Sequence, residues 1–209
     1  MNPLYIPPPK GEAQRRTVDE LFAHLRDELT WLEVTAARKE YFMSSAPRSY
    51  RYKTWDGERE YHSAPFTEPV RGLLAAMRLT TVLLPLESAV VGLQPLDFNV
   101  CFLNRYDTQH GHLGWHADDS PEMSHDHPIA VVSLGAEREI WWKPKAEKGE
   151  TPPDRRRLLE HGSVFVMPAG FQREYLHRIP KCDRAVGTRI SLTFRHYLDK
   201  EPAAAAGGG

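Results

Sequence analysis

The chain has 209 residues, 41% hydrophobic and 26% charged, a composition typical of a globular protein that can bury a core without disulfides. Its formal net charge of −1 excludes attraction to a polyanion through overall charge, so a nucleic-acid partner would need a local basic surface. No stretch approaches the roughly 20 apolar residues of a membrane-spanning helix, and the first five residues lack the order of a secretory signal. Cys101 and Cys182 form no disulfide framework, so we expect a cytoplasmic protein.

The N-terminal part is predicted to contain two helices. Residues 1–15, rich in proline and polar side chains, are expected to be an extended lead-in. Thr17 and Glu20 have the spacing of a capping box, which predicts that the first helix begins at Thr17. Its apolar residues recur at helical spacing: Leu21, Phe22, Leu25, Leu29 and Leu32. A second helix is expected after Thr67, where Pro69 suits a first turn.

The segment between these helices, residues 45–66, is polar and aromatic and has no helical period. It contains four large rings: Tyr50, Tyr52, Trp55 and Tyr61. We expect a β-hairpin or lid here, because aromatic residues favour strands.

From Phe98 onward the sequence is rich in β-branched and aromatic residues, separated by Gly, Pro and Asp. Strands are expected at residues 98–106, 129–134, 139–143, 163–167 and 189–197. Helices followed by short strands predict an α+β fold, with a jelly-roll core backed by the helices. We expect a single domain over residues 1–209. Its parts are helices and lid at 16–97, the jelly roll at 98–197 and a tail at 198–209.

One run of the chain is a candidate basic surface. Between Lys143 and Arg157 it carries six cations: Lys143, Lys145, Lys148, Arg155, Arg156 and Arg157. The simpler interpretation is a solvated loop, and charge alone does not decide between the two.

His116-Ala117-Asp118 is a candidate metal-binding motif. Side chains two residues apart on a strand project from the same face, so this imidazole and carboxylate can bind one ion. His177 is the candidate third ligand because it follows an apolar strand, whereas the other downstream histidines lie at turns. Two histidines and a carboxylate suit non-haem Fe(II), which needs open positions for a co-substrate and oxygen. Hydrolytic zinc sites can use the same ligand types.

The segment Arg189–Arg195 alternates with a period of two, so its two terminal arginines share a face with Ser191. Arginines that face a core need anionic partners, and the guanidinium group is well shaped to bind a carboxylate. The alternative is an edge strand with this face in water. Beside an iron site, the arginine strand predicts 2-oxoglutarate as the co-substrate.

Taken together, these motifs resemble the AlkB family of dioxygenases. The matching segments keep the family's order: Asn104–Tyr106, Gly114–Asp119, Pro128–Gly135, Glu160–Ser163, His177 and Arg189–Arg195. The resemblance covers residues 98–197 and, loosely, the lid. It implies a double-stranded β-helix, the jelly roll of this family, with His116, Asp118 and His177 as metal ligands.

The resemblance also implies that Fe(II), 2-oxoglutarate and O2 are used. The residues implied to hold 2-oxoglutarate are Asn104, Tyr106, Arg189, Ser191 and Arg195. Among them, Arg189 would pair with the distal carboxylate. Without the resemblance, Tyr106 is equally a core aromatic.

The implied reaction is oxidative demethylation of N-alkylated bases, such as 1-methyladenine or 3-methylcytosine, with release of formaldehyde, succinate and CO2. The expected partner is alkylated nucleic acid, DNA before RNA, with no membrane and a monomeric chain. A flipped base needs an aromatic partner, for which Trp55, Tyr61 and His116 are candidates. Asp119 could select the positive charge of a methylated base. The alternatives are lid packing for Trp55 and Tyr61, and support of a metal ligand for Asp119.

Two other functions are compatible with the sequence. One is a dioxygenase that acts on a protein or small molecule. Two observations keep this alternative open. Ser120 stands where several relatives carry an acidic residue, and the net charge of the chain is close to zero. The other is a catalytically silent jelly-roll binding module, against which the intact triad and the two arginines argue.

Overall fold

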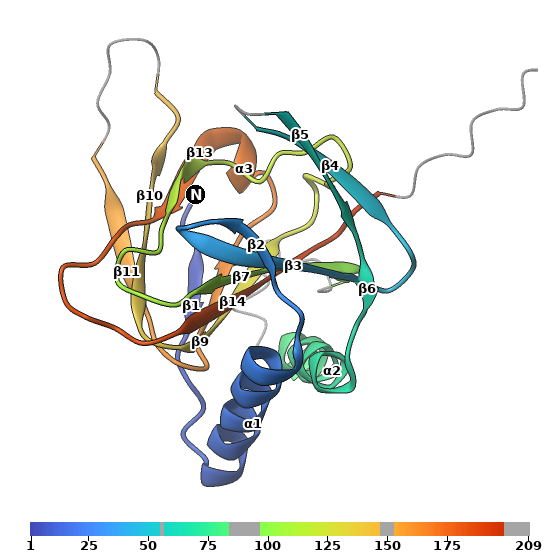
Figure 1. The fold of residues 1–209 in the computed structure, drawn as a ribbon, viewed down its shortest axis with the longest axis vertical. Coiled ribbons are helices and arrows are strands. Elements are labelled where there is room, and N and C mark those ends of the chain that lie inside the picture. Colours follow the sequence, from blue (N-terminus) through green and yellow to red (C-terminus); the bar gives the residue numbers. More distant parts are fainter. Residues whose placement is uncertain (55–56, 84–96, 147–152, 199–209) are drawn as a thin grey trace, which may run out of the picture.

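The computed structural model describes residues 1–54, 57–83, 97–146 and 153–198, and for 52–54, 57 and 79–83 it describes the backbone alone (Figure 1). Within this part, no helix is both long and apolar enough to cross a membrane. Trp55 and the tail at 199–209 lie outside the described residues.

Two sheets face each other and form the jelly roll. The major sheet has the order β1-β12-β9-β14-β7-β3-β2, and β6 pairs with β3. Its strands are β1 (Leu4–Ile6), β2 (Leu32–Thr35), β3 (Arg38–Ser44), β6 (Ala64–Pro65), β7 (Val100–Tyr106), β9 (Ile129–Gly135), β12 (Val164–Met167) and β14 (Arg189–Arg195). The minor sheet has the order β11-β10-β13-β8. Its strands are β8 (Leu113–His116), β10 (Arg138–Pro144), β11 (Arg155–Leu159) and β13 (Tyr175–Ile179). The expected jelly-roll fold is confirmed.

Helices and a hairpin complete the fold. Helices α1 (Glu12–Glu28) and α2 (Glu68–Leu83) lie next to each other on the outer side of the major sheet (Figure 1). The short helix α3 (Phe171–Glu174) leads into β13. Strands β4 (Ser49–Thr54) and β5 (Gly57–His62) pair only with each other among the described strands, so the predicted hairpin is confirmed.

Two apolar cores lie on either side of the major sheet. The outer core packs the helices against the sheet and includes Leu25, Val70 and Leu192. The inner core lies between the two sheets and includes Phe102 and Trp142. Burying apolar area on both faces makes the major sheet the central layer of the molecule.

Strand β14 contributes to both cores. Ile190, Leu192 and Phe194 belong to the outer core, while Arg189 and Arg195 alternate with them and face the interior between the sheets. The strand pairs with β9 on one side and β7 on the other. The alternative of a solvent-facing edge strand is therefore wrong, and the predicted alternation is confirmed.

The N-terminal boundaries differ from those predicted. Helix α1 begins after Gly11, inside the expected lead-in, and the Thr17 hydroxyl donates to the carbonyl of Ala13 one turn earlier. The capping box is therefore wrong. Its residues lie within a helix that starts earlier, because no proline or glycine interrupts the chain after Gly11. Leu32, expected on the helical stripe, lies in β2 and is 50% exposed.

Strands β2, β3 and β11 are among the elements that were not expected. Strands β2 and β3 lie within residues 16–97, which were predicted as helices and lid, and join the major sheet beside β7. The basic run at Lys143–Arg157 includes the edge strand β11, where the three arginines are exposed. It is therefore more than a solvated loop.

Candidate metal centre and adjoining cavity

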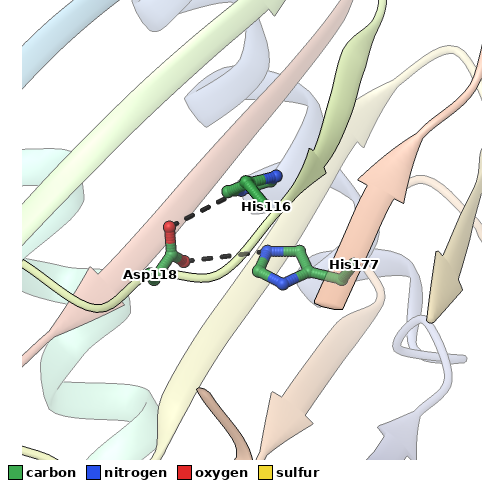
Figure 2. Close-up of side chains that lie close together, drawn as sticks. All are labelled: His116, Asp118 and His177. Atoms are coloured by element: carbon green, nitrogen blue, oxygen red, sulfur yellow. Dashed lines mark ion pairs between the residues drawn. The ribbon is translucent and has the colours of Figure 1, made fainter. Parts of the chain in front are cut away.

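His116, Asp118 and His177 converge on one point between the sheets (Figure 2). His116 ends β8 and lies directly opposite His177 in β13, with the two ring centroids 4.2 Å apart. Asp118 follows β8 by two residues. Its Oδ1 lies 3.6 Å from His116 Nε2 and its Oδ2 lies 3.8 Å from His177 Nε2. One ligand atom from each residue falls within 4.8 Å of the others, so the three could hold a single ion.

Each of the two imidazoles has a feature that suits it to metal coordination. His116 Nδ1 lies 2.9 Å from the carbonyl of Gly114, and since a carbonyl only accepts, Nδ1 carries the proton and Nε2 is left as the ligand atom. Burial, together with the neighbouring His116, lowers the pKa of His177 to about 3. His177 therefore offers a lone pair near neutral pH.

Asp118 is fixed through both its backbone and its carboxylate. Gln172 on α3 accepts a hydrogen bond from the Asp118 backbone N–H at 3.0 Å, and Arg195 Nη2 donates to Asp118 Oδ1 at 2.8 Å. Burial alone would raise the pKa of Asp118, but the neighbouring Arg195, His177 and His116 together outweigh it, so the net direction is downward. The group is therefore an oriented, ionised ligand. Two histidine nitrogens and one carboxylate would fit Fe(II) with open positions.

Arg189 is a buried cation suited to an anionic ligand. It is fully buried in β14, where Nη2 donates to Ser133 Oγ at 2.9 Å and the guanidinium carbon lies 5.5 Å from the Tyr106 ring centroid. Its Nε and Nη1 have no hydrogen-bond partner among the described residues. Burial lowers its pKa to about 10, which still leaves it charged near neutral pH. A carboxylate such as the distal end of 2-oxoglutarate fits these free donors.

Arg138 provides a comparison within the same interior. It is 2% exposed, but it donates to the backbone carbonyls of Gly111, at 2.8 Å, and Pro180. Its charge is thus used to hold two loops together. Arg189 has no backbone carbonyl as a partner among the described residues. Of the two arginines, Arg189 is therefore the one suited to bind an anionic ligand.

The other residues predicted to hold 2-oxoglutarate lie on the interior face of β7 and β14. Tyr106 lies opposite Arg189 in the strand register, and Ser191 lies opposite Asn104. Asn104 Oδ1 accepts a hydrogen bond from Arg38 Nε at 3.1 Å. Arg195 is engaged with Asp118. The strand register thus places all five predicted residues on one face of β7 and β14.

A cavity of about 480 Å³ opens beside the triad, within the range of small-ligand sites. It is lined by His116, Asp118 and Arg195, and by Tyr50 and Tyr61 of the lid hairpin. Asp119 and Ser120 also line this cavity, and Asp119 Oδ2 lies 3.6 Å from Lys145 Nζ.

Of the two lid rings predicted to stack on a base, Trp55 lies outside the described residues. Tyr61 lines the cavity, but it is 5% exposed and stacks on Tyr50, with centroids 6.1 Å apart. Its hydroxyl donates to the buried carboxylate of Glu40. Lid packing is therefore the observed role of Tyr61.

Sequence reasoning did not single out Arg38, Glu40 and Tyr50, which all line the cavity. Arg38 Nη2 lies 2.6 Å from Glu40 Oε1, so a continuous polar chain runs from Asn104 through Arg38 and Glu40 to Tyr61. The sequence around β3 gives no period-two alternation and only a short apolar run, Tyr41–Met43, so the strand that carries Arg38 and Glu40 was not predicted.

The comparisons with known proteins agree with this site. Residues 10–195 match a family model described as the 2OG-Fe(II) oxygenase superfamily. The chain belongs to this superfamily. The oxygenase is 31% identical to human DNA oxidative demethylase ALKBH2, over 86% of this chain and 69% of the human protein. It is 29% identical to bovine alpha-ketoglutarate-dependent dioxygenase alkB homolog 3, over 88% of this chain and 63% of the relative.

A solved structure described as "The structure of OsALKBH1" has a TM-score of 0.59 at 16% identity and covers 93% of this chain and 97% of that one, which supports the fold. The AlkB-type resemblance is confirmed, and the chain is an oxygenase that uses Fe(II), 2-oxoglutarate and O2.

Proposed function

We propose that this oxygenase demethylates N-alkylated bases of nucleic acids, with Fe(II) held by His116, Asp118 and His177. The observation that carries the proposal is the opening of the triad into a 480 Å³ cavity bordered by an aromatic lid and by carboxylates. The similarity to relatives named as DNA oxidative demethylases supports it.

Bound Fe(II) and 2-oxoglutarate would supply the oxidation of the N-methyl carbon by O2, with formaldehyde, succinate and CO2 as the products. The protein's own contribution is orientation. Arg189 would hold the distal carboxylate of 2-oxoglutarate through its free donors, and the Gly114 carbonyl keeps the His116 proton on Nδ1. Arg195 and Gln172 hold Asp118 in place.

The substrate would enter the cavity as a base turned out of its stack, or as part of a single strand. Tyr50 borders the cavity from β4 and offers an aromatic face, and His116 offers another from the metal side. The half-exposed carboxylate of Asp119 would favour a base made cationic by methylation. The lid and the buried Glu40 would limit the access of water to the reacting carbon.

The test is incubation of the protein with Fe(II), 2-oxoglutarate and oligonucleotides that carry 1-methyladenine or 3-methylcytosine, followed by mass spectrometry. We expect loss of the methyl mass only with both cofactors present, and no loss with Asp118→Ala. Turnover of 2-oxoglutarate without any loss of methyl mass would favour a protein or small-molecule substrate instead. The preference for DNA over RNA, a monomeric state and a cytoplasmic location stay predictions.

A further inference from the structure

The outer face of the minor sheet, on the back of the metal centre, carries a stack of alternating rings and cations. Trp115 and Arg178 directly precede and follow His116 and His177 in their strands, so their side chains project to the opposite face. The Arg178 guanidinium carbon lies 4.6 Å from the Trp115 ring centroid and 4.5 Å from that of Trp141. Lys143 Nζ lies 4.6 Å from the Trp115 centroid.

The residues of the stack lie side by side on three neighbouring strands, β10, β13 and β8. Trp141 in β10 lies directly opposite Arg178 in β13, and β13 pairs with β8, which carries Trp115. The Arg178 side chain is 29% exposed, and its Nε has no hydrogen-bond partner among the described residues. Its nearest acidic group in an ion pair is Asp154, at 3.9 Å. The two indole faces are therefore the main contacts that hold this guanidinium.

Strand β8 needs such support. It is four residues long, lies at the end of the minor sheet and pairs with β13 through an irregular register that shifts between His177 and Ile179. A slip by one residue would exchange the two faces of β8, which would turn His116 outward and Trp115 toward the metal site. Arg178 contacts Trp115 and Trp141 together in the observed register.

We propose that Arg178, held between Trp115 and Trp141, is a positioning residue that fixes the register of β8 against β13 and so sets the spacing of His116 and His177. The inference rests on the proposed ligation of the metal by these histidines. It adds a requirement for metal binding that lies outside the cavity and touches neither metal nor substrate.

The experiment is titration of the metal-free protein with Co(II), a spectroscopic substitute for Fe(II), monitored through its visible absorption. We expect Arg178→Gln to weaken Co(II) binding by about tenfold, the lower end of the effect of residues that orient metal ligands, and to alter the Co(II) spectrum. Arg178→Lys keeps the positive charge and should lose less Co(II) affinity than Arg178→Gln. Trp115→Leu should resemble Arg178→Gln, and Trp115→Phe, which keeps a ring, should restore most of the affinity.

The matched control is Arg156→Gln. Arg156 lies opposite Trp141 in the same row, but it is 68% exposed and its ion pair to Glu139 is long, at 3.9 Å. We expect wild-type Co(II) binding. Urea unfolding of each variant separates a local effect on the metal site from loss of the fold. If Arg178→Gln or Trp115→Leu does not fold, the conservative variants Arg178→Lys and Trp115→Phe are compared instead.

Two results would overturn the inference. If Asp118→Ala binds Co(II) as tightly as the wild type, the proposed ligands are wrong, and the inference fails with them. If Asp118→Ala loses binding while Arg178→Gln keeps affinity within about twofold and an unchanged spectrum, the ligands stand and only the role of Arg178 is wrong. If Arg178→Gln then lowers only the free energy of unfolding, the stack of Trp115, Arg178 and Trp141 stabilises the fold and does not position the metal ligands.

Discussion

At the scale of single residues, the interior between the sheets holds charges that are neutralised in different ways. Arg195 is paired with Asp118 at 2.8 Å, Arg38 with Glu40 at 2.6 Å, and Arg138 with backbone carbonyls. Among the described residues, Arg189 alone of these four arginines has neither a carboxylate nor a backbone carbonyl as a hydrogen-bond partner, and it donates to Ser133 Oγ. Because an unpaired buried charge is costly, a position that keeps one is expected to bind an anion.

Replacing Arg189 by methionine should therefore act on the co-substrate. Hydrogen bonds to a charged group contribute about 1.5–3 kcal/mol, so the KM for 2-oxoglutarate should rise roughly 10- to 100-fold. Succinate formation at varied 2-oxoglutarate measures this. Arg173→Gln, an exposed arginine on α3, is the control and should keep the wild-type KM. An unchanged KM in Arg189→Met would contradict the assignment of the distal carboxylate.

The polar chain from Asn104 to Tyr61 leads to a second residue-scale prediction. Tyr61→Phe removes the hydroxyl that donates to Glu40, leaving this buried carboxylate with Arg38. We expect a loss of about 1 kcal/mol in the free energy of unfolding, measured in urea. Glu40→Gln and the double variant complete a cycle, in which a coupling energy near zero would show that the lid is not anchored through this pair.

At the scale of elements, β14 joins the active site to the helices. Its outward residues pack under α1 and α2, and its inward residues face the triad. Leu192→Ala should lower the free energy of unfolding by about 2–5 kcal/mol, because it opens a cavity in the outer core. Leu158→Ala, at a leucine that is 42% exposed on β11, should change it far less. Similar losses in the two variants would argue against the two-core arrangement.

The sequence predicts an element when the pattern that marks it is local, and fails when the element depends on residues far apart in the chain. The metal triad and the alternation of β14 were predictable because each rests on local spacing or on an ordered family resemblance. Strands β2 and β3 were not, since Leu29 and Leu32 continue the helical spacing of α1 past its end at Glu28. The ion pair of Arg195 with Asp118 joins residues 77 positions apart, and no local pattern reports it.

At the scale of the whole molecule, the net charge of −1 makes any binding of nucleic acid dependent on local surfaces. Arg155, Arg156 and Arg157 are exposed on the edge strand β11 and form the clearest such surface. If Arg155 and Arg156 contact phosphates, each contributes a slope of about −0.9 to the dependence of log affinity on log salt for duplex DNA. The double variant Arg155→Gln/Arg156→Gln should then lose up to about two units of slope in fluorescence-anisotropy titrations. An unchanged slope would mean that these arginines are merely solvated.

Because β14 contributes both to the outer core and to the active site, insertions and deletions in it should be harmful. Loops between strands can gain or lose residues while the strands keep their places. A single codon inserted in or deleted from β14 would reverse every side chain beyond it, moving apolar residues such as Phe194 toward the metal site and Arg195 under the helices. Stability and catalysis would then be lost in one step. Length variation among natural relatives should therefore spare this strand, even where its individual residues change.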